Sequence, residues 1–174
     1  MKYLNYNLLI AGLCLLTAFK TLDKAALSVQ DEDKTFVKAA AEGGLLEVKL
    51  GELAMKNGSS KAVKDYGKMM IADHSKVNKE LMSLVKKKQM EVPTTLGPEK
   101  QQQYDSLAAV KDNTFDMVYM NMMILSHEQT IGIFQNESSA GTDPDLKKWA
   151  DSKVPALKHH LEMAESLFQT ANKK

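Results

Sequence analysis

The sequence contains no arginine, so all 23 of its basic residues are lysines. Arginine supplies the planar fork of hydrogen-bond donors that suits phosphate and carboxylate groups. The formal net charge is only +1, so there is no strongly basic field to attract nucleic acid. These absences argue against an arginine-based phosphate site, and we expect no nucleic-acid partner.

Cysteine, proline, glycine and aromatic residues are also scarce. The one cysteine, Cys14, lies in an apolar N-terminal segment, which leaves the rest of the chain without a disulfide, a thiolate metal ligand or a cysteine nucleophile. With 4 prolines, 9 glycines and 6% aromatic residues, the composition favours helices over sheets. The length of 174 residues suits one domain with a sizeable core.

The N-terminus has the pattern of a secretory signal peptide. Lys2 is followed by an apolar run over residues 8–19, which is shorter than the roughly 20 residues of a membrane span. Residues 1–26 are therefore expected to be a signal peptide, or an N-terminal anchor, plus a linker, and residues 27–174 the folded domain. Lipidation of Cys14 is disfavoured because a leucine precedes it. We expect an exported protein that is periplasmic or associated with the outer membrane, with the N-terminal segment as its means of envelope association.

Apolar residues recur at helical spacing through the rest of the chain, and no hairpin signal occurs. The pattern predicts an all-α fold, a four-helix up-down bundle of the ferritin-like kind with a long central crossover that carries a short helix. Pro155 predicts a kink or break in the last helix. A linker is expected over residues 19–30. The helices are expected from Asp31–Asp33 to Lys56, from a cap at Ser59 or Ser60 to Lys88, over 99–110, from Asn113 to about 137 with Asp116 in its first turn, and from Asp143 onward.

Four polar residues interrupt these apolar stripes, one on each long helix: Glu47, His74, His127 and His160. A buried carboxylate or imidazole is costly unless it is paired or bound to a metal. Together the four predict a metal site in the bundle core, which leaves the ion open among zinc, iron, manganese and copper. Acidic neighbours offer extra or outer-shell ligands; they are Asp73, Asp116, Glu128 and Glu162.

Three other interpretations of the polar and sulfur-containing residues compete with a single metal site. The polar residues could only set helix register in a structural or interaction protein of the envelope, with neither metal nor catalysis. A di-iron redox enzyme is disfavoured because its Glu-x-x-His spacing is absent, with Ile71, Ile124 and Leu157 in the glutamate positions. Six methionines could bind Cu(I), but methionine more commonly fills helical cores; they are Met69, Met70, Met117, Met120, Met122 and Met123. No catalytic residue is predicted, and an enzyme is less expected than a binding protein.

Several motifs occur in an order that resembles a known family. They are the segments 36–44 (FVKAAAEGG), 47–51 (EVKLG), 69–75 (MMIADHS) and 154–157 (VPAL), together with Phe115-Asp116, Tyr119 and His160-Leu161. Over about residues 31–170 the chain resembles the exported bacterial proteins grouped as "domain of unknown function 4142", often labelled outer membrane proteins. The resemblance implies a ferritin-like bundle and a periplasmic or outer-membrane location, and it supplies no activity. It places Glu47, Asp73, His74, His127 and His160 on recurrent polar positions.

Overall fold

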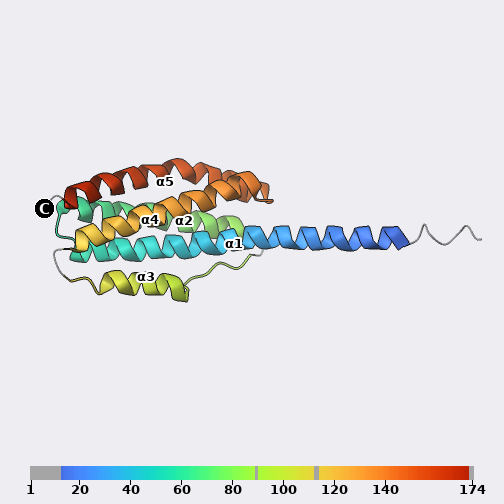
Figure 1. Cartoon of the computed structure of the whole chain (residues 1–174), viewed down its shortest axis with the longest axis horizontal. Helices are drawn as coiled ribbons and strands as arrows, with labels where there is room; N and C mark the ends of the chain where they lie inside the picture. Colours follow the sequence, from blue (N-terminus) through green and yellow to red (C-terminus); the bar gives the residue numbers. More distant parts are fainter. Residues whose placement is uncertain (1–12, 89, 112–113, 173–174) are drawn as a thin grey trace, which may run out of the picture.

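The computed structural model describes residues 13–88, 90–111 and 114–172, with side chains described from residue 32 onward. Every regular element in these ranges is a helix, and four of the five helices are long (Figure 1). The prediction of an all-α bundle with a helical crossover is confirmed. The elements are α1 (Leu13–Asn57), α2 (Lys61–Lys86), α3 (Pro98–Ala108), α4 (Phe115–Ala140) and α5 (Pro144–Ala171).

The bundle is built from two antiparallel hairpins, α1 with α2 and α4 with α5, and packing is most extensive within each hairpin. Short turns close the hairpins at opposite ends of the bundle. The crossover from α2 carries α3 back along the outside of α1 and α4 (Figure 1). The chain therefore re-enters the bundle at the end where α2 began, so that α2 and α4 run in one direction and α1 and α5 in the other.

Helix α1 begins earlier than the sequence pattern predicts. It runs unbroken for 45 residues from Leu13, so the prediction of a linker over 19–30 and a helix start at Asp31–Asp33 is wrong. The reason is local: residues 13–30 contain neither glycine nor proline, so nothing stops the helix from extending N-terminally. Its first turns project beyond the rest of the bundle in Figure 1.

The first 12 residues, where the predicted signal peptide begins, lie outside the described part of the chain, and the division at residues 26 and 27 stays a prediction. Within the described ranges, no helix combines the length and apolar character needed to cross a membrane.

Two of the predicted helix caps are confirmed, and two acidic residues have different roles from those predicted. Ser60 caps α2 by accepting a hydrogen bond from the Val63 amide, and Asp143 caps α5. Asp116, predicted to serve the start of its own helix, accepts instead from the Ser59 and Ser60 amides, both at 2.8 Å. The predicted helix start at Asn113 lies outside the described residues; α4 has Thr114 at its N-cap.

Asp33 performs the same task at the other end of the bundle. It is 2% exposed, and its carboxylate accepts from the Thr142 amide at 2.9 Å, the Thr142 hydroxyl at 2.6 Å and the Asp143 amide at 3.0 Å. Each hairpin turn is thus held by a buried aspartate of the other hairpin. We call Asp33 and Asp116 the end clamps.

A buried glutamate beside the Asp33 clamp predicts a pH-dependent stability. Burial, followed by the charge of Asp33, raises the pKa of Glu137 from 4.5 to about 7. The native state therefore keeps a proton that the unfolded chain loses above pH 4.5, so this group destabilises the fold increasingly between pH 4.5 and 7. We expect Glu137→Gln to remove this effect, with a stability gain on the order of 3 kcal/mol at pH 8 that disappears by pH 4.5.

Thermal melts of the variant and the wild type at pH 4.5, 6 and 8 measure this difference. Glu128→Gln, an exposed substitution on the same helix, is the matched control and should give equal shifts at all three values. If the melting-temperature difference between Glu137→Gln and the wild type were the same at all three pH values, it would contradict the raised pKa of Glu137.

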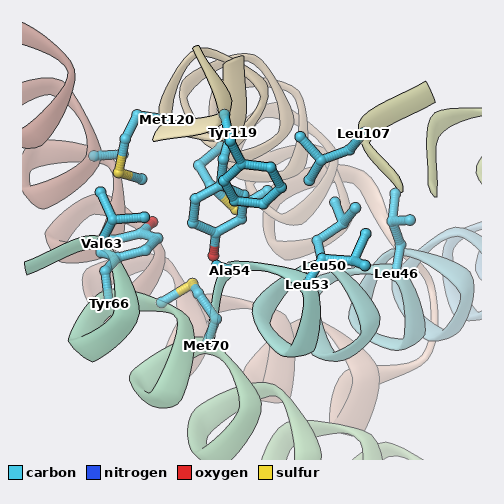
Figure 2. Packing of buried hydrophobic residues seen from close by; sticks show 13 residues of the cluster. Leu46, Leu50, Leu53, Ala54, Val63, Tyr66, Met70, Leu107, Tyr119 and Met120 are labelled. Carbon is cyan, nitrogen blue, oxygen red and sulfur yellow. The ribbon is translucent and has the colours of Figure 1, made fainter. Parts of the chain in front are cut away.

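The apolar core is divided into two clusters along the bundle axis. One cluster includes Leu50, Tyr66 and Met120, and the other includes Phe36, Leu81 and Phe134. In the first cluster Leu107 of α3 faces the leucines of α1, which shows how the crossover helix covers the bundle (Figure 2). The buried methionines of α2 and α4 fill this same cluster, as expected for core packing. The space between the two clusters holds the polar residues described below.

Helix α5 continues through Pro155 without a break, contrary to the break that the sequence predicts as one alternative. Helices α1 and α2 approach each other closely at Gly51 and Gly67. A Cβ atom on Gly67 would lie 2.8 Å from the Gly51 carbonyl oxygen, so only glycine permits this approach.

Candidate metal centre

The three predicted histidines lie in one layer at the junction of the two apolar clusters. His74 on α2, His127 on α4 and His160 on α5 are 6%, 1% and 4% exposed. Their ring centroids are 5.5–5.8 Å apart. Each histidine lies four residues or fewer from a buried apolar residue on its own helix, so helical periodicity turns all three rings inward.

One ring nitrogen from each histidine lies within 4.8 Å of those from the other two. A tetrahedral ion with bonds of about 2.0–2.1 Å would hold such nitrogens about 3.3 Å apart. Small side-chain movements would therefore bring all three onto one ion. Among the described residues this is the one group of three or more histidine, cysteine or acidic side chains close enough to share an ion.

In two of the three histidines, one ring nitrogen makes a hydrogen bond that sets the tautomer. His127 Nδ1 donates to the Met123 carbonyl at 2.8 Å, and His160 Nε2 donates to an Asp73 carboxylate oxygen at 3.0 Å. Each of the three histidines also has one buried ring nitrogen without a hydrogen-bond partner: His74 Nε2, His127 Nε2 and His160 Nδ1. This pattern matches that of metal-binding histidines, whose second nitrogen is held by a carboxylate or carbonyl.

The pKa values of two of the histidines, His74 and His160, are shifted toward the neutral form that binds metals. Burial, followed by the proximity of His127 and His160, lowers the pKa of His74 to about 3. Burial also lowers the pKa of His160, although the Asp73 carboxylate acts in the opposite direction. An imidazole that is neutral at pH 7 keeps its lone pair available for coordination.

The acidic candidates are distributed differently from the histidines. Asp73 is half exposed at the edge of the layer and contacts His160, the outer-shell role predicted for it. Asp116 is distant, at the end clamp, and Glu128 and Glu162 are exposed. Glu47 is buried in the layer but does not belong to the group of nitrogens that could share an ion.

The carboxylate of Glu47 is anchored on one side only. Its Oε1 accepts a hydrogen bond from the Ser126 hydroxyl at 2.6 Å, and its Oε2 is buried without a partner. Two tyrosines lie close by: burial, followed by the charge of Glu47, raises the pKa of both Tyr66 and Tyr119. Tyr66 donates to the His160 carbonyl at 3.1 Å, whereas the Tyr119 hydroxyl is unpaired.

A cavity of about 60 Å³ adjoins the histidines. Residues of all four long helices line it, among them Gly43, Glu47, His74, Ile133 and His160. A Cβ atom on Gly43 would meet nothing within 4 Å, so this position adds open space to the cavity that Glu47 also lines. The remaining polar lining residues are Asp73, Thr130 and Lys153, and a mostly apolar wall with a few polar groups suits a small ligand.

Sequence reasoning missed the residues that support the layer. Ser126, Tyr66 and the Met123 carbonyl all contact a predicted site residue. Ser126 directly precedes His127, and that adjacency is the one local signal available. Hydrogen bonds to backbone carbonyls, or between residues 79 and 94 positions apart, leave no mark on the periodicity of the sequence.

Comparisons with known proteins agree with this architecture. The family model described as "Domain of unknown function (DUF4142)" matches residues 18–167 of the chain. No sequence among the curated proteins matches. A solved structure titled "CopM in the Cu(II)-bound form" is similar, with a TM-score of 0.67 and 17% sequence identity over 79% of this chain and 96% of that one. At this identity the likeness shows the fold.

Proposed function

The chain belongs to the family described as domain of unknown function DUF4142, and we propose that it binds one divalent transition-metal ion in its bundle core through His74, His127 and His160. Two observations carry the proposal: one ring nitrogen of each histidine lies within 4.8 Å of those of the other two, and each histidine has a buried ring nitrogen without a hydrogen-bond partner. Each unpaired buried acceptor costs about 1–3 kcal/mol. A shared ion would satisfy all three at once.

Copper is the ion that we propose first. Imidazole ligands suit copper, zinc and nickel, and Cu²⁺ binds most tightly among the divalent first-row ions. The similar fold of a protein whose title gives a Cu(II)-bound form supports the same choice. The buried methionines do not contribute to the histidine layer, because they pack within the neighbouring apolar cluster.

Titration of the metal-free protein with Cu²⁺ and Zn²⁺ in a calorimeter tests the proposal. We expect one ion per chain, and a higher melting temperature with metal, because binding to the folded state alone stabilises it. Absence of stoichiometric binding of either ion, with an unchanged melting temperature, would favour the alternative that the histidines only set helix register in a structural protein of the envelope.

We also propose that the protein acts outside the cytoplasm, as the N-terminal pattern predicts, and that the ion is held in the periplasm or at the outer membrane. Cell fractionation of the full-length chain checks this location, and recovery of the protein in the cytoplasmic fraction would contradict it. The proposal of metal binding does not depend on the outcome.

A further inference from the structure

Glu47 has no role in metal binding by the three histidines, although its carboxylate is buried in the same layer. It is 4% exposed, and the Ser126 hydroxyl fixes one of its oxygens at 2.6 Å. The other oxygen, Oε2, has no hydrogen-bond partner. A buried carboxylate is costly without partners, and no hydrogen bond from the described residues reaches this oxygen.

Glu47 lines the same cavity as two of the histidines. Glu47, His74 and His160 all line the space of about 60 Å³. One water molecule needs roughly 10–15 Å³ of such volume. The cavity therefore has room for solvent between the carboxylate and an ion on the histidines, whereas the carboxylate itself lies outside the group that could share the ion.

An ion with three protein ligands keeps a fourth position for water or another small molecule. Building on the metal-binding function above, we propose that Glu47 accepts a hydrogen bond from the solvent ligand in that fourth position, and that its charge makes the position selective for neutral ligands over anions. Glu47 is then a positioning and specificity-determining residue, not a metal ligand. The Ser126 hydroxyl orients it by holding its other oxygen.

The selectivity follows from charge. A water molecule on the ion can donate a hydrogen bond to Glu47 Oε2, whereas an anion in the same place would face the Glu47 carboxylate. The one lysine in the cavity lining, Lys153, is already paired with Glu80 at 2.6 Å. Like charges within about 4–6 Å typically shift such equilibria by an order of magnitude or more. With Glu47 present, the fourth position on the ion therefore favours exchangeable water, and replacement of the Glu47 carboxylate by a neutral group allows anions to bind there.

Binding of azide to the Co²⁺-loaded protein, followed by visible absorption, tests this. In Glu47→Gln, which keeps the shape of the side chain, we expect azide affinity to rise about tenfold or more, with Co²⁺ still bound one to one. Ser126→Ala, which retains the charge of Glu47, should bind azide nearly as weakly as the wild type. Glu52→Gln, an exposed substitution on the same helix, is the matched control.

An unchanged azide affinity in Glu47→Gln would overturn the inference. Loss of Co²⁺ binding in that variant, with its circular dichroism intact, would also overturn it, because Glu47 would then be a direct ligand. Failure of the wild type to bind Co²⁺, Cu²⁺ or Zn²⁺ would instead overturn the proposed function, and this inference with it.

Discussion

Replacement of His74 by alanine is expected to lower the affinity for Cu²⁺ by more than about 100-fold, since loss of an outer-shell partner alone typically costs 10–100-fold. His74 supplies one of three nitrogens that lie within 4.8 Å of one another, and its Nε2 has no other partner. With two histidines left, the ion would lose a third of its protein ligands. Calorimetric titration of the metal-free variant measures the change.

The matched control for this variant is His159→Ala. His159 is exposed and adjacent to His160, so its removal should leave the affinity unchanged. Stability of the metal-free protein separates the two roles that a buried histidine can have. Burial of an unpaired imidazole nitrogen destabilises the fold, and its removal offsets the packing that is lost with the side chain. His74→Ala should therefore alter the stability of the metal-free protein by less than about 1 kcal/mol.

A different result would support the structural alternative. Unchanged Cu²⁺ affinity in His74→Ala, together with a large loss of stability in the metal-free protein, would show that the histidine sets helix register and that any bound ion lies elsewhere.

Replacement of Asp33 by alanine is expected to destabilise the fold by about 3 kcal/mol, because hydrogen bonds to a charged group contribute about 1.5–3 kcal/mol and the abandoned donors would be left unpaired. Asp33 receives three hydrogen bonds from Thr142 and Asp143, at 2.6–3.0 Å. They join α1 to the turn between α4 and α5. Denaturant unfolding at pH 8 measures the loss.

Glu32→Ala is the matched control, because Glu32 precedes Asp33 on α1 and is exposed; it should change stability by less than about 0.5 kcal/mol. Removal of Asp33 also removes the charge that raises the pKa of Glu137, which offsets part of the cost at high pH. The net loss should therefore be larger at pH 5 than at pH 8. Equal losses in the Asp33 and Glu32 variants would show that the clamp contributes nothing.

Local patterns predicted those features of the bundle that depend on neighbouring residues. Ser60 and Asp143 begin helices where the sequence places them, because a cap is a contact over two or three residues. The predicted start of α1 was wrong because the acidic residues at 31–33 resemble the first turn of a helix, although no glycine or proline in residues 13–30 stops a helix from beginning earlier. Asp33 and Asp116 were assigned to their own helices, whereas each binds a turn more than 50 residues away.

The sequence by itself determined that the chain forms amphipathic helices and that each long helix places one polar residue on its apolar face, since the helical period follows from the order of residues alone. Only the tertiary structure decided that the three histidines share one layer while Glu47 stands apart from their common centre. The reason is that the axial shift and rotation of each helix relative to its neighbours are set by side-chain packing between elements, including the glycine contact of α1 with α2 and the aspartates that join the hairpins.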